Sequence, residues 1–482
     1  MRTPAGETTD DETGKPAPVA ESFPFWRSVW QALKGEDHDY TALTLKRAVL
    51  LLAVPMVLEM VMESLFAVVD IFWVGRLGPE AIAVVGLTES IMTLVYAVGM
   101  GTAIAGTAIV ARRIGEKDPA GASRAAGQVL LLGVGMSAAL GLVLGLLAPQ
   151  ILRLMGAEET VVVLGADFAR IMLGGNITVF LIFLINAVFR GAGDAAIAMR
   201  TLWLANALNI VLDPCFIYGW GPFPEMGVTG AAVATNIGRG VGVCYQVWHL
   251  TGRPGRVRLH WKDLRPDWML MGTTLKTAGP GIAQWMIGTT SWLGLFKILA
   301  GFGSGALAGY TISIRIMMFV WMPAWGLSNA GATLVGQNLG AGRPERAEHS
   351  VMIAMKYNTL FLSVVGLLFV IFARPLASVF TSNPEVLGHA TRALWIVSLG
   401  FPIFAAGMCL EGAFNGAGDT KTPTRLNFYC LWLGQVPAAW LLAQPLGLGP
   451  DGVFIAVPVA FAALALWSWF LFKRGKWKLQ EI

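Results

Sequence analysis

The sequence predicts an all-α polytopic membrane protein, with twelve transmembrane helices in two parallel six-helix repeats. Three observations support this fold class. Hydrophobic residues make up 55% of the 482 residues and charged residues only 13%, which is typical of a chain that crosses a membrane many times. Twelve apolar segments follow one another along the chain. Short motifs of the first half return in the second half at a constant offset.

Several function classes lack support in the sequence. It contains no P-loop, no HExxH and no GxSxG motif, so we expect neither an enzyme nor a cofactor. The four cysteines lie in apolar segments without metal-ligand or redox spacing. The net charge of +5 is explained by basic cytoplasmic loops, and no nucleic-acid partner is expected.

The first element is a polar, acidic and proline-containing tail, residues 1–40, which we expect to be a disordered cytoplasmic segment. Within it, Trp26, Val29, Trp30 and Leu33 recur at helical spacing. This pattern predicts a short helix that lies on the membrane surface, and an ordinary disordered tail is the alternative.

The spanning helices come next, and their connections differ in charge. We expect helices at 46–74, 80–110, 122–151, 161–189, 197–219, 227–250, 268–300, 304–335, 347–373, 387–414, 425–445 and 450–472. The even-numbered connections are rich in lysine and arginine, whereas the odd-numbered ones are poor in both. By the positive-inside rule, both termini are cytoplasmic and the protein resides in the cell inner membrane.

The duplication is seen in paired motifs. Gly193-Asp194 returns as Gly418-Asp419, an offset of 225 residues, and the same offset relates Pro55 to Pro280. Six is an even number of spans, so both halves enter the membrane from the same side and are parallel repeats. Such repeats predict a transporter with a cavity between or within the halves near the midplane. The expected divisions are an N-terminal lobe at 41–250, a cytoplasmic linker at 251–267, a C-terminal lobe at 268–474 and a cytoplasmic tail at 475–482.

The first span carries three acids, Glu59, Glu63 and Asp70, within one helical stripe. A carboxylate that faces lipid is costly, so this stripe should face a wet cavity or a partner helix. We assign Glu59 and Glu63, together with Asn206 of the fifth span and Glu89 of the second, to a cleft for cationic substrates. For the acids of the first span, structural pairs with buried arginine or lysine are the alternative. Pro55, one turn earlier, is expected to bend the helix.

A second polar stripe lies on the fifth span, where Asn206, Asn209 and Asp213 share one face. Asp70 and Asp213 should lie at similar depth and could take up a proton. With Asn209 and the hydroxyl of Thr235 on the sixth span, the same groups could instead supply oxygens to sodium. The acids are confined to the first half, because their counterparts in the second half are not acidic: Gln284, Gly288, Leu295 and Ala438.

Two further features involve the eighth span. Arg315 aligns with Ser90, next to Glu89, so we expect Glu89 and Arg315 to pair across the cleft in one transport state; the alternative is that each is satisfied within its own half. Met317 and Trp321 are candidates for a cleft that holds flat apolar cations, and helix packing is the alternative. The sequence assigns no role to Lys297 or Glu411.

Several motifs together resemble the multidrug and toxic compound extrusion (MATE) family over residues 45–472. They are VDIFWVGRLG (69–78), RGAGD (190–194), NIVLDP (209–214), VGQNLGAGRPERA (335–347) and NGAGDTKTP (415–423). The resemblance implies two six-helix bundles around a V-shaped cleft, and export of organic cations by proton or sodium antiport. The branch called DinF-like implies coupling residues at Asp70, Asn209 and Asp213, and a threonine at Thr235 or Thr229.

The chain departs from the NorM branch of that family. The acids expected there on the seventh and tenth spans are replaced by Gln284 or Met286 and by Phe404, so a sodium site in the C-terminal lobe is not expected.

The resulting expectation is a monomeric antiporter for small amphipathic or cationic organic substrates, surrounded by membrane lipids, with a proton or sodium as the coupling ion. Three alternatives stay open. A flippase for lipids or lipid-linked oligosaccharides would need a cleft lined by arginine and lysine. An intramembrane aspartyl protease would use Asp70 and Asp213, and a passive channel could not concentrate its substrate.

Overall fold

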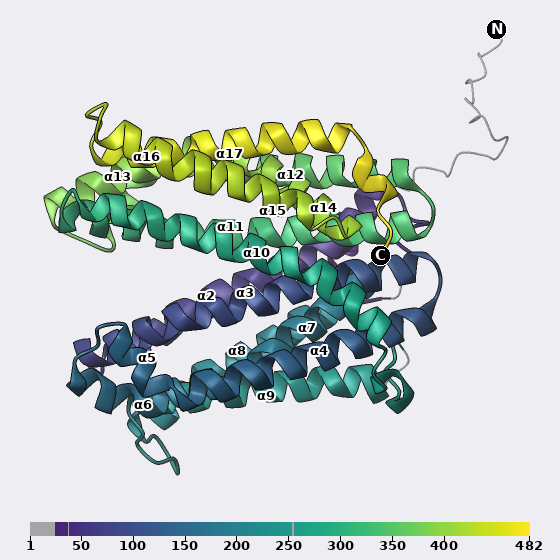
Figure 1. The fold of residues 1–482 in the computed structure, drawn as a ribbon, viewed down its shortest axis with the longest axis horizontal. Coiled ribbons are helices and arrows are strands. Elements are labelled where there is room, and N and C mark those ends of the chain that lie inside the picture. The colour runs from purple at the N-terminus through teal and green to yellow at the C-terminus, as the bar shows by residue number, and fades with distance from the viewer. Residues whose placement is uncertain (1–24, 37, 253–254) are drawn as a thin grey trace, which may run out of the picture.

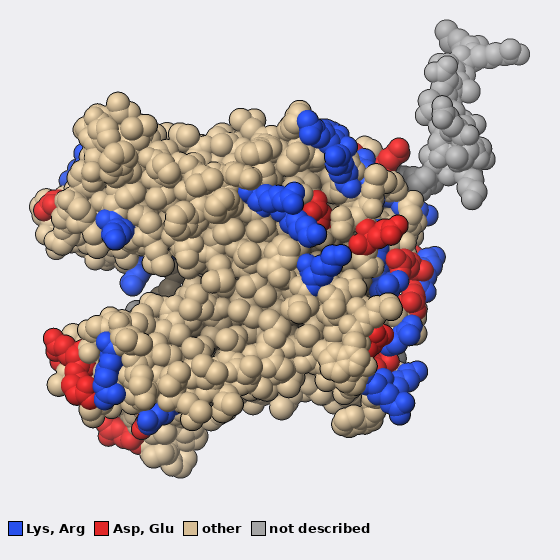
Figure 2. Space-filling view, viewed as in Figure 1, with Lys and Arg blue, Asp and Glu red and all other residues tan. Residues whose placement is uncertain are grey.

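The fold is seen in a computed structural model, which describes residues 25–36, 38–252 and 255–482. All the regular secondary structure of these residues is helical, and the predicted fold class is confirmed. The helices form two lobes, which converge near the termini and separate at the opposite end (Figure 1). In the space-filling view the separation is an open cleft (Figure 2). On that face, charged side chains gather mainly near the termini, with a smaller group at the open end and an uncharged band between them.

The N-lobe contains α2–α9 and the C-lobe contains α10–α17. The N-lobe helices are α2 (Leu45–Gly75), α3 (Pro79–Gly115), α4 (Pro119–Leu146), α5 (Ala148–Leu154), α6 (Glu159–Gly174), α7 (Ile177–Ala192), α8 (Ala195–Tyr218) and α9 (Val228–Gly252). The linker carries the short helix η1 (Trp261–Leu264). The C-lobe helices are α10 (Trp268–Ala300), α11 (Ser304–Gly340), α12 (Pro344–Ser378), α13 (Pro384–Leu399), α14 (Phe401–Ala417), α15 (Lys421–Asn427), the π-helix η2 (Phe428–Gln435), α16 (Val436–Ala443) and α17 (Pro450–Lys473), followed by η3 (Lys476–Leu479).

These elements account for the twelve predicted spans. Among the described residues, nine helices are long and apolar enough to cross a membrane, and the bent pair α13–α14 can make a tenth. The other two predicted spans are α9 and α10, with 25 and 33 residues, which are long enough to cross but less apolar. α2 is a continuous helix through Pro55, so the predicted bend is not seen as a break in this structure.

The short helix expected in the N-terminal tail is present as α1 (Phe25–Lys34). Trp26 and Trp30 are exposed, whereas Ser28 and Ala32 face the protein and are buried. Of the remaining part of the predicted disordered tail, residues 1–24 and 37 lie outside the described residues.

Where the two lobes converge, one helix of each lobe packs against the other lobe. The first half of α2 packs against α11 and α12 of the C-lobe, with Leu52 and Met56 buried beside Ala330 and Leu334. In the same way, α10 packs on α3 of the N-lobe. This reciprocal arrangement is what two parallel repeats produce around a pseudo-twofold axis.

Glycines allow the closest contacts of this closed end. A Cβ atom on Gly115 would overlap the carbonyl oxygen of Gln337, and one on Gly340 would overlap that of Arg112. Gly115 and Gly340 are related by the repeat, and so are Arg112 and Gln337. The end of α3 and the end of α11 therefore meet backbone to backbone at equivalent points.

The loop before α2 also joins the lobes. The Tyr40 hydroxyl donates to the carbonyl oxygen of Gly193 in the N-lobe at 3.0 Å. From the C-lobe, Arg343 Nη1 donates to the carbonyl oxygen of Thr41 at 2.8 Å. Residues 38–43 therefore form a bridge across the closed end.

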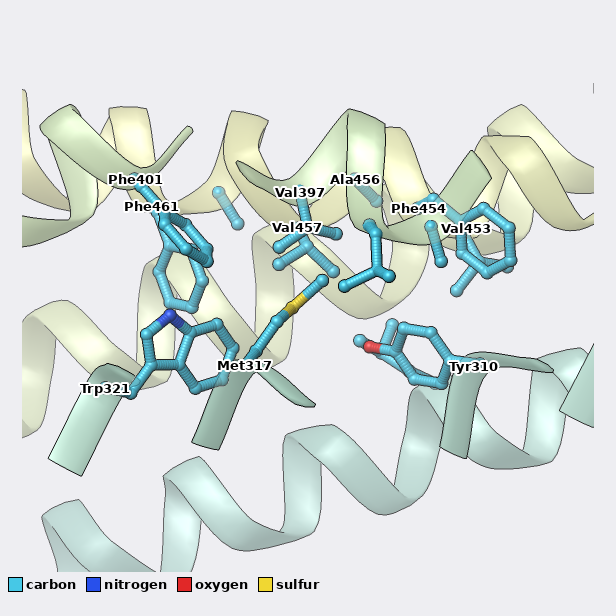
Figure 3. Close-up of a cluster of buried hydrophobic side chains, with 14 of the residues drawn as sticks. Tyr310, Met317, Trp321, Val397, Phe401, Val453, Phe454, Ala456, Val457 and Phe461 are labelled. Carbon is cyan, nitrogen blue, oxygen red and sulfur yellow. The ribbon is translucent and has the colours of Figure 1, made fainter. Parts of the chain in front are cut away.

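The C-lobe core is rich in aromatic side chains. Met317 and Trp321 of α11 face Phe401 of α14 and Phe461 of α17 (Figure 3). Such rings contribute large apolar area and favour tilted or edge-on contacts. This packing holds α11 against the outer helices of the C-lobe.

Candidate functional site

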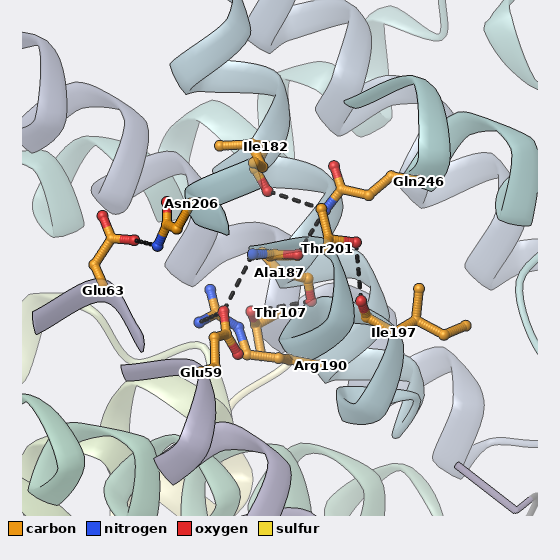
Figure 4. A network of polar contacts seen from close by, with 11 residues as sticks. Glu59, Glu63, Thr107, Ile182, Ala187, Arg190, Ile197, Thr201, Asn206 and Gln246 are labelled. Carbon is orange, nitrogen blue, oxygen red and sulfur yellow. Dashed lines mark hydrogen bonds and ion pairs between the residues drawn. The ribbon is translucent and has the colours of Figure 1, made fainter. Parts of the chain in front are cut away.

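The acidic stripe of α2 enters the N-lobe, where Glu59 is only 1% exposed. Its Oε1 accepts a hydrogen bond from Asn186 Nδ2 at 3.1 Å and forms an ion pair with Arg190 Nη1 at 3.4 Å (Figure 4). Gln246 Nε2 of α9 in turn donates to Asn186 Oδ1 at 2.5 Å. This arrangement is the structural pair that the sequence analysis kept as an alternative. Glu59 does not line the cavity described below, and its assignment to the substrate cleft stays a prediction.

Glu63, one turn further along α2, is partly buried and accepts a hydrogen bond from Asn206 Nδ2 of α8 at 3.0 Å (Figure 4). Arg239 of α9 is buried and interacts electrostatically with Glu63 and Asp70, and its guanidinium also contacts Tyr96. A basic side chain within the sixth span therefore balances part of the acidic stripe.

The predicted coupling residues come together between α2, α8 and α9. Asp213 is 0% exposed and Asn209 is 2% exposed. With the Asn209 amide oriented so that its oxygen and nitrogen both find partners, Nδ2 donates to Asp213 Oδ2 at 2.9 Å, and Oδ1 accepts from the Thr235 hydroxyl at 3.0 Å. Asp213 also interacts electrostatically with Asp70. The structure thus places all four residues in one polar cluster, with Thr235 as the threonine beside Asn209.

Glu89 of α3 and Arg315 of α11 are both exposed, and the charge of Arg315 acts on Glu89. Arg239 acts on Glu89 more strongly. Among the ion pairs of the described residues, none closer than 4.0 Å joins Glu89 to Arg315. Their pairing therefore stays a prediction for another state of the transport cycle.

A cavity with a volume of 340 Å³ lies between the lobes and is lined mostly by the C-lobe. Trp321, which the sequence assigned to the cleft, lines this cavity. Met317 does not; it is 1% exposed and belongs to the core in Figure 3. The methionines that do line the cavity from α11 are Met318 and Met322, because they lie on the helix face toward the cleft.

Several polar residues escaped the sequence analysis. Arg190 was placed in a basic connection, and Arg239, Asn186, Gln246 and Tyr96 were not considered. The motif RGAGD points to Arg190, but no sequence signal shows that its side chain turns back toward Glu59. Arg239 is a lone charge within an apolar segment, and such a charge usually has a buried partner.

Two six-helix lobes with buried acids in one of them and a cleft open at one end form the architecture of a membrane transporter with repeated halves. The family model MatE matches residues 55–215 and 282–441. The chain belongs to this family, as its motifs predict.

Individual relatives match over almost their whole length. The probable multidrug resistance protein NorM of Thermotoga maritima is 28% identical over 442 residues, 91% of this chain and 94% of that protein. The FAD transporter of Shewanella oneidensis is 23% identical over 91% of this chain and 97% of that protein. Among solved structures, the outward-facing conformation of a multidrug resistance MATE family transporter has a TM-score of 0.85 at 27% identity, and the match covers 91% of this chain and 98% of that one.

Proposed function

We propose that this protein exports organic cations across the cell inner membrane by antiport with protons, and that both of its termini lie in the cytoplasm. Asp70, Asn209, Asp213 and Thr235 are the coupling residues in this proposal. The protein works as a monomer within the lipid bilayer, and transport proceeds through a conformational change with no covalent chemistry.

The observation that carries the proposal is the pair of aspartates in the N-lobe, Asp70 and Asp213. The Asp213 carboxyl is fully buried, accepts a hydrogen bond from Asn209 and faces Asp70. Two carboxylates held together away from water repel each other, so a site of this kind favours a proton or a cation between them. Its occupation can then be linked to the orientation of the lobes, because each state binds the ion with a different affinity.

The charge of the cavity supports a cationic substrate. Arg190 and Glu411 are the ionisable groups among the described lining residues, and Arg190 is already paired with Glu59. The flippase alternative calls for several free arginines or lysines, which this lining does not offer. One relative is named for FAD transport, so family membership alone does not fix the substrate.

The test is substrate movement in proteoliposomes under a proton gradient and, separately, under a sodium gradient. Ethidium movement that the proton gradient drives, and that Asp70→Asn removes, is the expected result. Movement driven by sodium alone would assign the same oxygens to a metal ion. If Asp70→Asn exports ethidium at the wild-type rate, or if FAD moves and ethidium does not, the proposal is wrong.

A further inference from the structure

The Glu59 network of the N-lobe has a counterpart at the same positions of the C-lobe. Each counterpart lies 225 residues later in the sequence. The pairs are Glu59 and Gln284, Asn186 and Glu411, and Arg190 and Asn415. In both lobes the first residue lies on the first long helix of the repeat, and the other two lie one turn apart on the fourth span.

The two sets differ in charge. In the N-lobe, the acid Glu59 and the base Arg190 neutralise each other within the bundle. In the C-lobe the acid, Glu411, has moved to the fourth span, and the position of the arginine is taken by the neutral Asn415. The C-lobe set therefore contains one acid, and no basic residue replaces Arg190.

The C-lobe set also has unused hydrogen-bond acceptors. Gln284 Oε1, Glu411 Oε1 and Asn415 Oδ1 are each shielded from solvent and have no hydrogen-bond partner in the described part of the chain. Asn427 forms a hydrogen bond with the Glu411 carboxyl, but Glu411 Oε1 stays without a partner. Buried polar atoms are rarely left without partners, so three unpaired oxygens around one space indicate a missing donor.

All three residues line the 340 Å³ cavity, whose other walls are aromatic and thioether side chains. Trp285 and Trp325 contact each other there with ring centroids 4.8 Å apart, and Trp292 lies 5.8 Å from Trp321. Aromatic faces attract cations, and the attraction grows in a site that excludes water. The volume suits a small organic ligand, because such sites occupy about 300–1,000 Å³.

We propose that the C-lobe cavity is a binding site for a flat aromatic cation with N–H donors, whose charged group takes the place that Arg190 occupies in the N-lobe. Glu411 is the counter-charge, and the amide oxygens of Gln284 and Asn415 accept from the N–H groups. The inference deepens the proposed export of organic cations and rests on it. It places the substrate in the lobe opposite to the coupling aspartates.

Arg190 also reaches the lining of this cavity, but it does not cancel Glu411. Its guanidinium is paired with Glu59, and among residues 25–36, 38–252 and 255–482 no ion pair to Glu411 is found. A cation bound in this cavity is therefore close to the Glu59–Arg190 ion pair and to Glu411, which has no basic partner among the described residues.

The test is equilibrium binding to the purified full-length protein in detergent, with no gradient applied. The probe is proflavine, a flat tricyclic cation with amino groups, and the comparison is acridone, an uncharged tricycle of similar outline. We expect wild-type protein to bind proflavine at least tenfold more tightly than acridone. Glu411→Gln should weaken proflavine binding at least tenfold and change acridone binding by less than twofold. Glu225→Gln, which removes an exposed carboxyl from the loop before α9, is the matched control and should change neither.

A second variant distinguishes a loss of the binding site from a loss of folding. Asn415→Arg supplies the base that the C-lobe lacks, so it should pair with Glu411 and weaken proflavine binding about tenfold while the protein keeps its thermal stability. Equal affinities of wild type and Glu411→Gln for proflavine, or equal wild-type affinities for proflavine and acridone, would overturn the inference.

These outcomes are separate from those of the transport assay. Binding that depends on Glu411 without any gradient-driven movement would leave the site in place and reject the antiporter. Gradient-driven movement that depends on Asp70, combined with binding that ignores Glu411, would reject the site alone.

Discussion

The two lobes are copies of one ancestral unit, yet they treat the same positions in opposite ways. In the N-lobe, Glu59 and Arg190 form a buried pair inside a packed bundle. In the C-lobe, the equivalent Gln284 and Asn415 border a cavity walled by tryptophans. The difference teaches that the repeat constrains the backbone more strongly than it constrains the side chains.

The close helix contacts show what the repeat has kept. A Cβ atom on Gly191 would approach the Thr107 carbonyl oxygen to 2.8 Å. A Cβ atom on the equivalent Gly416 would approach the Ala332 carbonyl oxygen to 2.2 Å. These glycines bring helices together at equivalent places in both lobes. The side chains differ around this shared backbone arrangement: the N-lobe holds the cluster of Asp70 and Asp213, and the C-lobe holds most of the aromatic cavity.

The largest expected effect comes from breaking the N-lobe pair. Arg190→Met leaves Glu59 buried without a counter-charge and should lower the free energy of unfolding by about 3–5 kcal/mol. Glu59→Gln combined with Arg190→Met removes both charges and should recover most of that loss. Thermal unfolding in detergent measures both, and Asn415→Met, at the equivalent C-lobe position, serves as the control with a small effect. Equal losses for Arg190→Met and Asn415→Met would show that the two sites are not electrostatically different.

The next effect separates coupling from substrate binding. Asp213→Asn removes an acid of the coupling cluster and should reduce proton-driven ethidium transport about a hundredfold, equivalent to about 2.7 kcal/mol. Glu411→Gln should instead raise the ethidium concentration needed for half-maximal transport while transport stays dependent on the proton gradient. Initial rates in proteoliposomes over a range of ethidium concentrations distinguish the two. The reverse result would exchange the roles assigned to the lobes.

A smaller effect tests the equivalent backbone contacts that α3 and α11 make at the closed end. Gly115→Ala forces a Cβ atom into the carbonyl oxygen of Gln337 and should destabilise the closed end by about 1–3 kcal/mol. Gly340→Ala should cost a similar amount, because it is the equivalent contact. Gly135→Ala on α4 meets nothing within 4 Å and is the matched control. Thermal unfolding reports the losses, and a large difference between Gly115→Ala and Gly340→Ala would show that the closed end is not symmetric.

The smallest effect concerns the bridge between the lobes at residues 38–43. The Thr41 hydroxyl and backbone amide both donate to Asp39 Oδ1, at 2.6 Å and 3.0 Å. The hydroxyl contact, followed by the amide, holds the pKa of Asp39 below its ordinary value. The resulting stabilisation is present above the unfolded-state pKa of about 3.9 and is lost as pH falls through the lower folded-state value.

Because Asp39 is exposed, solvent screening keeps this contribution below about 1 kcal/mol. Hydrogen exchange of residues 38–43 in wild type and Asp39→Asn, compared at the same pH, measures it. Wild type should be better protected at pH 6, and its advantage should shrink as pH falls below about 3.9. An advantage that does not shrink on acidification would contradict the assignment.

The sequence predicted the fold because its signals are regular. Hydropathy located all twelve spans, and the offset of 225 residues exposed the two halves. The aspartate cluster was also predictable, because helical spacing brings Asn209 and Asp213 onto one face and similar depth brings Asp70 opposite them.

The partners of Glu59 were not predicted, because helical periodicity gives no information on how far a side chain at the end of one span reaches into another. The polar lining of the predicted cavity was missed for a different reason. The repeat offset was applied to the acids of the first half but not to Asn186 and Arg190, so Glu411 was named without a role and its relation to the Glu59 network was not recognised. Met317 and Met318 differ by one residue, and only the packed structure shows which of them faces the cleft.

The backbone contacts of Gly115 with Gln337 and of Gly340 with Arg112 have a mechanical consequence. α3 and α11 each contain 37 residues and so extend about 55 Å from the point where they touch. With the pivot at one extremity, a rotation of about 10° moves the far end of such a helix by about 10 Å, by the same rise per residue. A small rotation of α3 against α11 at these glycines therefore produces a large displacement of the helix ends at the open side of the cleft.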